Sequence, residues 1–309
     1  THENLAMLAL LFPVFGCTLN SMRNFFPFDS DMLGLLIVDE ASLSHPSYII
    51  SGLYRCQKVV ILGDTHQLEP ILPHGLKNTN FNFDIPLQEK VFCQSDNNIS
   101  VQSLSEKAVS SIMCLTEHFR CQKDIMQISN ELCDYQLDIL TPKARQSKAS
   151  KFLSAPLLYQ DIVGNECLLG TSAFNLEEVT AVVNCLNQLL KYNVSLQKIG
   201  IITPYLAQKG KIRNALKEKN ISIDEELGVF VETIHGFQGG EKEIIIFSLV
   251  KTQKPNQYTN FLNRKHNMLN VAISRAQKHL IVIGSMQGLK YGKFGKVLQG
   301  AIQNAWFAL

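Results

Sequence analysis

The sequence predicts an α/β protein whose sheets are mostly parallel. Short apolar runs of strand length alternate with amphipathic segments of helix length, an order that requires crossover connections between strands. Polar and charged residues follow several of these runs directly, which places them at the carboxyl ends of the strands, where such sheets hold ligands. With 309 residues, 46% hydrophobic and 18% charged, the chain can form two domains with substantial cores.

Composition limits the classes of partner and compartment. The net charge of +2 gives no general basis for binding nucleic acid, so any basic surface must be local. The eight cysteines include no CxxC pair, which favours reduced thiols over a disulfide framework or metal site. No apolar run reaches bilayer length. We expect no membrane association and a cytoplasmic location, or a nuclear one in a eukaryote. The start at Thr1 suggests a fragment of a longer protein.

In the first third of the chain, the apolar residues 5–15 predict a strand that feeds a turn, and residues 20–31 predict a loop. The run Leu35 to Val38 predicts a strand buried on both faces. Residues 58–62 predict a second strand, which breaks at Gly63. Residues 74–103 show no sustained period and predict an irregular connection, with a domain boundary near residues 100–110.

The rest of the chain again alternates helices and strands. Leu176 to Leu190 has apolar residues at helical spacing, and acidic residues suit its first turn. The basic stretch 141–151 predicts an exposed loop. The other expected helices are 124–133, 207–218 and 267–276, and the expected strands are 114–120 (with a polar turn), 199–204, 229–233, 243–250 and 279–284.

Two adjacent carboxylates, Asp39 and Glu40, end the first buried strand. Such a pair suits nucleotide hydrolysis, in which one carboxylate holds Mg²⁺, usually through water, and the other orients and deprotonates the attacking water. Taken alone, the pair is explained about equally well by a solvated acidic turn.

Polar side chains in two further stretches have plain structural explanations when each is taken alone. In Gly63-Asp-Thr-His-Gln-Leu-Glu-Pro70, Gln67 can report on a phosphate or water at a strand end, or simply stabilise a turn. In Glu117-His-Phe-Arg120, a phenylalanine that we expect to be buried precedes Arg120, which has no obvious acidic neighbour in sequence and is most simply a surface cation.

Two later stretches are similarly ambiguous. In Thr233-Ile-His-Gly-Phe-Gln-Gly-Gly-Glu241, glycines permit close backbone approach to a ligand, but glycine loops are common. In Leu269-Asn-Val-Ala-Ile-Ser-Arg-Ala276, Arg275 is most simply a solvated residue at the end of a core helix.

Taken together and in this order, these stretches and Ile-Thr-Pro-Tyr205 resemble the motifs of superfamily 1 helicases. The resemblance is to the branch of the nonsense-mediated-decay RNA helicase and the Dna2-type DNA helicases, and it extends from Phe15-Gly-Cys-Thr18 to Gly284. It implies a RecA-like P-loop NTPase fold with parallel sheets flanked by helices. Residues 1–105 would be the carboxyl-terminal part of the first RecA-like domain, and residues 106–309 the second. It also implies ATP and Mg²⁺ as cofactors and a single strand of DNA or RNA as partner.

The resemblance assigns roles to the matching residues around the nucleotide. Asp39 is similar to the magnesium-holding carboxylate and Glu40 to the water-activating one. Gln67 is similar to the residue that senses the terminal phosphate. Arg120 and Arg275 are similar to arginines that reach that phosphate across an open, hydrated cleft between the two domains.

The remaining assignments concern the phosphates, the ribose and the polynucleotide. Gly239 and Glu241 are similar to residues near the phosphates and ribose. The residues similar to groups that grip the nucleic-acid backbone are Thr18, Thr203, Pro204, Thr233 and His235.

One departure from the family pattern affects function directly. The phosphate-binding loop Gly-x-x-x-x-Gly-Lys-Ser/Thr occurs nowhere in the sequence. We expect it in a missing amino-terminal part of the same protein, so the chain by itself should hydrolyse ATP poorly. The alternative is a non-catalytic nucleic-acid-binding or scaffolding module on the same fold. A recombinase-type ATPase is a weaker alternative, because the last two motifs are of helicase type.

Overall fold

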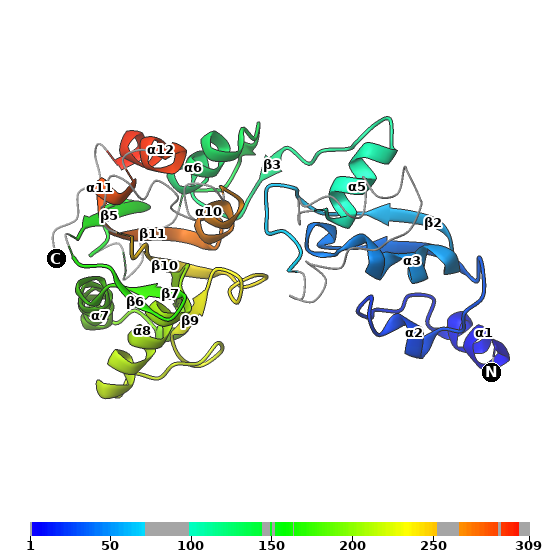
Figure 1. Ribbon diagram of the computed structural model, residues 1–309, viewed down its shortest axis with the longest axis horizontal. Coiled ribbons are helices and arrows are strands. Elements are labelled where there is room, and N and C mark those ends of the chain that lie inside the picture. The colour runs from blue at the N-terminus through cyan, green and yellow to red at the C-terminus, as the bar shows by residue number, and fades with distance from the viewer. Residues whose placement is uncertain are drawn as a thin grey trace. The chain divides into compact units, whose positions relative to one another are not determined.

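The computed structural model describes residues 2–71, 99–143, 149, 152–162, 164–251, 266–289 and 292–302. It divides into two compact units, Thr1–Met113 and Cys114–Leu309. Figure 1 shows both units with their helices and strands labelled.

Unit 1 is built around a small parallel sheet. Strands β1 and β2 pair in parallel, with Leu36 beside Val59 and Val38 beside Ile61. Helix α3 connects the two strands and packs against both of them. The elements of unit 1 are α1 (His2–Leu11), α2 (Met22–Phe25), β1 (Leu33–Val38), the 3₁₀ helix η1 (Ala41–Leu43), α3 (Pro46–Arg55), β2 (Cys56–Ile61) and α5 (Val101–Ala108).

Three expectations for unit 1 were wrong. The stretch 5–15 is not a strand, because α1 occupies His2–Leu11. An apolar run without periodicity does not distinguish the two structures, and its Leu, Ala and Met residues favour a helix. The expected loop 20–31 contains α2, and the expected irregular connection 74–103 ends in the first turn of α5. The rest of that connection, residues 74–98, lies outside the described residues.

Strand β1 is confirmed, but it is not buried on both faces. Leu36 and Val38 are 8% and 3% exposed and pack with α2, α3 and α5, whereas Leu35 and Ile37 are 51% and 59% exposed. Alternation along the paired strands places Val60 on the same side as Ile37. We call the exposed apolar surface formed by Leu35, Ile37 and Val60 the open face of unit 1.

Unit 2 contains a five-stranded sheet in the order β5-β11-β10-β8-β9, with every neighbouring pair parallel. The strands of unit 2 are β3 (Glu117–His118), β4 (Asp138–Ile139), β5 (Leu157–Asp161), β6 (Cys167–Leu169), β7 (Ser172–Phe174), β8 (Ile199–Thr203), β9 (Phe230–Thr233), β10 (Lys242–Ser248) and β11 (Ala276–Gly284). Its helices are α6 (Lys123–Cys133), α7 (Leu176–Lys191), η4 (Leu196–Lys198), α8 (Leu206–Glu218), α10 (His266–Ile273), α11 (Met286–Leu289) and α12 (Lys293–Ile302).

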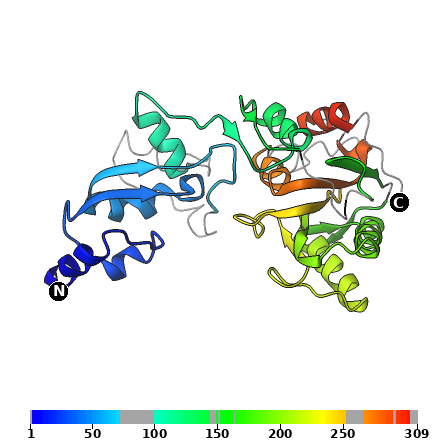
Figure 2. The ribbon, with the colours of Figure 1, turned by 180° about the vertical axis from the view of Figure 1, so that it is seen from behind.

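Two helix layers enclose the five-stranded sheet. Helices α6, α10 and α12 pack together on one side, and α7 and α8 lie on the other, as both ribbon views show (Figures 1 and 2). Such a parallel sheet between helices agrees with the predicted α/β class, and with the predicted helices and strands from residue 176 onward to within a few residues at each end.

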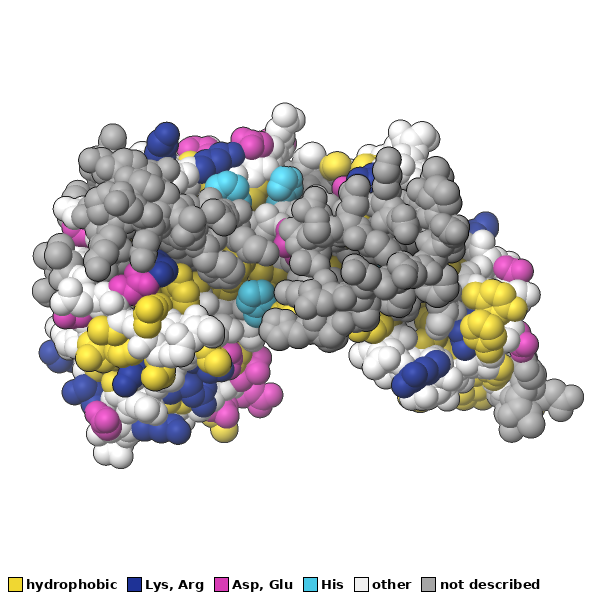
Figure 3. Space-filling view, in the orientation of Figure 1, with side chains coloured by type: hydrophobic (Ala, Val, Ile, Leu, Met, Phe, Trp, Pro, Cys, Tyr) yellow, Lys and Arg dark blue, Asp and Glu magenta, His cyan; other side chains and the backbone are white. Residues whose placement is uncertain are grey.

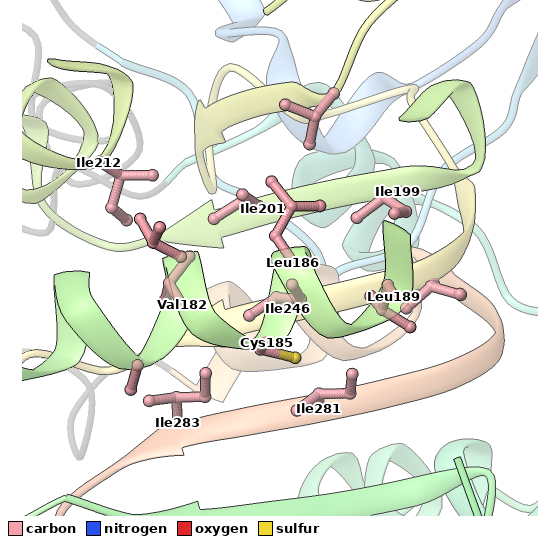
Figure 4. Packing of buried hydrophobic residues seen from close by; sticks show 14 of the residues in the cluster. Val182, Cys185, Leu186, Leu189, Ile199, Ile201, Ile212, Ile246, Ile281 and Ile283 are labelled. Atoms are coloured by element: carbon pink, nitrogen blue, oxygen red, sulfur yellow. The ribbon is translucent and has the colours of Figure 1, made fainter. Parts of the chain in front are cut away.

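The core of unit 2 lies between the sheet and the α7–α8 layer. Figure 4 shows side chains from α7, α8 and three neighbouring strands meeting there, among them Leu186, Ile201 and Ile246. Ala149 belongs to this core at 6% exposure, so the expected exposed loop 141–151 is wrong at that position. The polar residues beside it in the sequence gave no sign of this burial, and residues 144–148 and 150–151 of that stretch lie outside the described residues.

The net charge of the chain is small, but charged side chains cluster on parts of its surface. Figure 3 shows lysine and arginine side chains gathered over the end of unit 2 that holds α8, with acidic side chains beside them. None of the helices among the described residues is both long and apolar enough to span a bilayer. Within the same residues, all seven cysteines are free thiols.

Candidate nucleotide and nucleic-acid site

Asp39, the predicted magnesium-holding carboxylate, and Glu40, the predicted catalytic one, lie exposed at the carboxyl end of β1. Asp39 accepts a hydrogen bond from the backbone N–H of Glu40 through Oδ1 at 2.9 Å. Glu40 has φ 51° and ψ 40°, a left-handed conformation that costs a residue with a side chain about 1–3 kcal/mol. The hydrogen bond from Ala41 N to Leu62 O, at 2.9 Å, holds the chain on the far side of this turn. The backbone therefore keeps Glu40 in a conformation it would not adopt on its own.

Gly63 lets the loop after β2 approach the loop after β1. A Cβ at Gly63 would lie 2.9 Å from Gln102 Oε1, 3.0 Å from Ser42 N and 3.1 Å from Ala41 N. The first distance is too short for a Cβ, and the other two, to backbone atoms, are tighter than ordinary contacts. The carboxylate pair and the Gly63–Gln67 loop, predicted as separate motifs, thus meet in one place, and Gln102 of α5 lies beside them.

Gln67 is held by its own loop. Its Nε2 donates to Asp64 Oδ2 at 3.3 Å and its backbone N–H to Asp64 O at 3.0 Å. Three buried oxygens in unit 1 have no partner among the described residues: Gln67 Oε1, Ser42 Oγ and Gln102 Oε1. Buried oxygens without a partner are costly unless a ligand or water satisfies them.

These residues fit a hydrated Mg²⁺ ion with a phosphate. Mg²⁺ prefers oxygen ligands, keeps several waters and is bound by one or two carboxylates together with substrate phosphates. Asp39 supplies an exposed carboxylate, and the unpartnered oxygens can accept from water. The described residues contain no group of three or more His, Cys, Asp or Glu side chains placed to hold an ion by themselves.

In unit 2, three stretches far apart in sequence meet at the amino ends of β10 and β11. Arg120 Nε pairs with Glu241 Oε2 at 2.8 Å, with both side chains about half exposed. Arg275 Nη1 donates to Gly240 O at 3.4 Å, and the N–H of Lys242 donates to Arg275 O at 3.1 Å. We call Arg120, Glu241 and Arg275 the arginine cluster.

The two arginines lie in different environments. Arg275 is only 5% exposed, and its Nε donates to Val271 O at 3.1 Å, so the expectation that it faces an open, hydrated cleft was wrong. Arg120 is exposed, as expected, but its acidic neighbour Glu241 is distant in sequence. The preceding Phe119 is 61% exposed and not buried. Nothing in the local sequence distinguishes this exposed phenylalanine from a buried one.

Two residues that sequence reasoning missed shape this cluster. Cys121 donates through Sγ to Ser274 O at 3.3 Å, and its N–H donates to His118 Nε2 at 2.8 Å. Burial raises the pKa of the Cys121 thiol to about 12, against the opposing effect of both arginines, so the thiol stays neutral. Burial and Arg120 lower the pKa of His118, which favours the neutral imidazole that accepts this hydrogen bond.

Gly239 and Glu241 belong to the loop between β9 and β10. Gly239 has φ +78°, a conformation that side chains rarely adopt, and a Cβ there would meet nothing within 4 Å. Glu241 also accepts from Gln277 Nε2 through Oε1 at 2.8 Å. The glycine is therefore required by backbone conformation, and it leaves open space at this position.

The predicted nucleic-acid contacts of unit 2 lie at the carboxyl ends of β8 and β9, where Thr203 and Thr233 are paired. His235 is exposed, Pro204 is partly buried, and Thr233 Oγ1 accepts from Gly236 N at 3.3 Å. We call these residues with Thr203 the carboxyl edge.

Two threonines that were predicted to contact nucleic acid have hydroxyl groups that are either buried or hydrogen-bonded within the protein. Thr203 is fully buried, and its hydroxyl has no partner among the described residues, so its side chain does not reach the surface in this structure. Thr18 in unit 1 is exposed, but its Oγ1 accepts from Ser21 N at 3.2 Å and lies 2.8 Å from Ser21 Oγ. It therefore stabilises the turn before α2.

Comparisons with known proteins show the family of the chain. A family model described as an AAA domain matches residues 98–287. The chain belongs to this family. Helicase Sen1 of Schizosaccharomyces pombe is 32% identical over 268 residues, which cover 82% of this chain and 15% of that protein.

Two further relatives are also helicases by name. The DNA polymerase alpha-associated DNA helicase A of Saccharomyces cerevisiae is 27% identical, covering 86% of this chain and 40% of that protein. The mouse 5′-3′ DNA helicase ZGRF1 is 26% identical, covering 89% of this chain and 14% of that protein. The chain thus spans well under half the length of each of these relatives and corresponds to the carboxyl-terminal portion of a superfamily 1 helicase.

Among solved structures, the arterivirus nonstructural protein 10 helicase is 15% identical. The match covers 86% of this chain and 41% of that one, with a TM-score of 0.42.

Proposed function

We propose that the chain is part of an ATP-dependent helicase or translocase that moves along one strand of DNA or RNA in the 5′ to 3′ direction. The observation that carries the proposal is the arginine cluster, in which residues 120, 241 and 275 are joined by an ion pair and a neighbouring carbonyl contact. An exposed guanidinium held by a carboxylate is a group that a phosphate can recruit in place of that carboxylate. The names of the relatives support the helicase reaction, and the name of the mouse relative supports the direction.

In unit 1, the proposal gives each carboxylate a separate task. Asp39 holds the hydrated Mg²⁺ ion, and Glu40 accepts the proton of the attacking water. Gln67, oriented by Asp64, leaves Oε1 to accept from that water. When bound, ATP with Mg²⁺ supplies the phosphoanhydride bond whose hydrolysis drives movement.

In unit 2, Arg120 neutralises negative charge on the transferred phosphoryl group. Arginines in this role raise the rate by about a thousandfold or more. Arg275 acts mainly through position, because its guanidinium is bound to Val271 O and orders the end of α10 beside Gly240. Glu241 orients Arg120, and Gly239 leaves space for the nucleotide.

The carboxyl edge is the proposed binding surface for single-stranded nucleic acid. Backbone groups, hydroxyls and an exposed imidazole bind phosphates and sugars without reading base sequence. His235 and Thr233 are accessible for such contacts, and Thr203 supports them from beneath. Nothing in this set distinguishes a DNA strand from an RNA strand.

The open face of unit 1 supports the further proposal that an amino-terminal part of the same protein packs on it. Leu35 and Ile37, more than half exposed, lie in a parallel sheet, a kind of sheet that is almost always covered on both faces. In the proposal, that part carries the phosphate-binding loop and completes the first RecA-like domain. We propose that the complete protein acts in the cytoplasm, or in the nucleus of a eukaryote.

A non-catalytic binding or scaffolding module is the second candidate. It is favoured by the same-unit partners of both arginines, Glu241 for Arg120 and backbone carbonyls for Arg275. Such contacts are sufficient to explain these residues as structural groups.

ATP hydrolysis by the full-length protein, with and without single-stranded nucleic acid, decides between the two candidates. A motor hydrolyses ATP faster with the strand, and it unwinds duplexes with a 5′ single-stranded tail. Glu40→Gln should stop hydrolysis and keep nucleotide binding, whereas Asp39→Asn should weaken Mg²⁺-dependent binding as well. A full-length protein that binds the strand but hydrolyses no ATP supports the scaffolding module.

A further inference from the structure

Residues 234–241 form a loop that crosses the sheet of unit 2 from one edge to the other. Strands β9, β8 and β10 are all parallel, so the carboxyl end of β9 and the amino end of β10 lie at opposite edges. Lys242 begins β10 about six positions below the level of Thr233, a separation of roughly 20 Å at the usual rise per residue. This crossing loop therefore begins at the carboxyl edge and ends at the arginine cluster.

One side chain fixes the middle of the crossing loop. Phe237 is fully buried, and its ring lies 4.6 Å from the ring of Phe230. It occupies the space above Gly200 in β8, where a Cβ would lie 2.5 Å from Phe237 Cζ and 2.7 Å from Ile245 Cδ1. Because Gly200 has no side chain, the phenylalanine ring packs directly against its backbone.

The backbone of Phe237 is hydrogen-bonded to residues on both sides of it in the loop. Its N–H donates to Thr233 O at 2.9 Å, and its carbonyl accepts from Gly240 N at 3.1 Å. Gly240 O in turn accepts from Arg275 Nη1 at 3.4 Å. A continuous set of hydrogen bonds therefore joins Thr233, through Phe237 and Gly240, to Arg275.

We propose that Phe237, seated on Gly200, is a positioning residue that ties the carboxyl edge to the arginine cluster, so that a strand bound at one edge sets the phosphate-contacting groups at the other. The inference rests on the proposed function, because it gives that function its path between the two sites in unit 2. If the ring moves and carries its backbone with it, Thr233 and Gly240 would be displaced together, because each is hydrogen-bonded to the backbone of Phe237.

The chain offers a matched pair of substitutions. Gly200→Ala places a methyl group about 2.5 Å from the ring, so the ring must move, and we expect the crossing loop to move with it. Gly210→Ala, in α8, is the control, because a Cβ there meets nothing within 4 Å. Phe237→Leu shortens the side chain, so the double variant Gly200→Ala/Phe237→Leu removes the collision with the ring. The contact that remains is with Ile245 Cδ1, the end of a flexible side chain.

The first measurement is amide hydrogen exchange of the 309-residue chain, together with its thermal midpoint. We expect Gly200→Ala to speed exchange at the amides of residues 236–240, while those of α7 keep their protection. Gly210→Ala should leave exchange in the loop unchanged, with a thermal midpoint equal to or above that of the wild type because alanine favours a helix. The double variant should regain most of the protection. Equal acceleration in α7 and the loop, or no acceleration in the loop, would overturn the proposal. If Gly200→Ala does not fold, Phe237→Leu alone should still speed exchange in the loop.

The second measurement is the ratio of ATP hydrolysis with and without single-stranded DNA in the full-length protein. Gly200→Ala should lower this ratio about fivefold or more, as expected for loss of coupling between sites. The double variant should restore it. An unchanged ratio in a variant whose loop exchanges faster would overturn the coupling role. Absence of hydrolysis in the wild type would contradict the proposed function, and the exchange measurement would still decide whether Phe237 anchors the loop.

Discussion

Arg275 and Arg120 hold their guanidinium groups in environments that predict stability losses of different size. Arg275→Ala removes two hydrogen bonds from a buried cation to backbone carbonyls, at a cost of about 3 kcal/mol or more in the free energy of unfolding. Arg120→Ala removes an exposed ion pair, worth about 1 kcal/mol or less. Urea unfolding of the two variants measures both values. Equal losses would contradict the difference in burial.

For function, Arg120 is the clearer of the two arginines, because its removal leaves the fold intact. In the full-length protein, Arg120→Ala should lower kcat far more than it weakens nucleotide binding, the pattern of a contact made in the transition state. Arg120→Lys should restore little activity, since an ammonium lacks the planar fork that grips two oxygens. Steady-state kinetics and nucleotide titration test this directly. A loss confined to affinity would place Arg120 outside the transition state.

Glu178 predicts a pH dependence of stability. It is fully buried in the first turn of α7, where Oε2 accepts from Ser248 Oγ at 2.6 Å and Val250 N at 2.8 Å. Burial nevertheless raises its pKa to about 7. Because the folded-state pKa is raised, protonation stabilises the fold at low pH, and this stabilisation is lost as pH rises from about 4.5 through 7. The loss is about 3 kcal/mol.

The substitution Glu178→Gln tests this effect. An amide carries no charge, so the thermal midpoint of the variant should fall less between pH 5 and pH 8 than that of the wild type. Glu218→Gln is the control, because Glu218 lies exposed at the end of α8 and is not among the groups that shift the pKa of Glu178. If both variants follow the wild-type profile, the ionisation of Glu178 does not control stability.

At the scale of elements, the close approach of the loops after β1 and β2 depends on Gly63. Gly63→Ala should separate the Asp39–Glu40 turn from the loop that holds Gln67, because Ser42 N and Ala41 N lie about 3 Å from the added methyl group. Backbone atoms cannot move aside as a flexible side chain can. We expect loss of stability by about 1–3 kcal/mol and weaker Mg²⁺-dependent nucleotide binding in the full-length protein.

Gly34→Ala is the matched control for that substitution. Gly34 lies in β1, and a Cβ there meets nothing within 4 Å. The thermal midpoint should therefore stay level or rise slightly, since alanine restricts the unfolded chain. An equal loss of nucleotide binding in both variants would show that the loop contact does not matter.

Helices and strands were predicted well where one face of the element is buried, because the apolar residues then recur at helical or strand spacing. They were predicted poorly where the apolar residues show neither spacing. Leu176 to Leu190 has clear helical spacing, and α7 spans Leu176–Lys191. Residues 5–15 are apolar throughout, and the expected strand is the helix α1. The exposed side of β1 was not predictable, because the strand's composition does not tell which neighbours cover it.

Site residues show a similar limit. Motif order located Asp39, Glu40 and Arg120 at the ends of strands. The burial of Arg275 and of Thr203 depends on packing from distant parts of the chain, which no local pattern records. Gln102 beside Gly63 and Phe237 on Gly200 carried no signal, since a single glutamine or phenylalanine is ordinary in a core.

At the scale of the whole molecule, the open face of unit 1 predicts self-association of the chain alone. Leu35 and Ile37 expose apolar side chains on a short parallel sheet, and such surfaces favour association. Light scattering should show a mass that rises with concentration. Leu35→Lys/Ile37→Lys should reduce the association, whereas charge reversal on α8 should not. A monomer at all concentrations would show that this face is not adhesive.

The strand order of unit 2 has a consequence for synthesis of the chain. Strand β11, the last in sequence, lies between β5 and β10, so the first strand of this sheet has no hydrogen-bonded neighbour until β11 arrives. At about 5–20 residues per second, a ribosome needs several seconds to deliver the residues between them. During that interval β5 is an unpaired edge that a chaperone can bind, and a ribosome stalled before Ala276 should display a protease-sensitive unit 2.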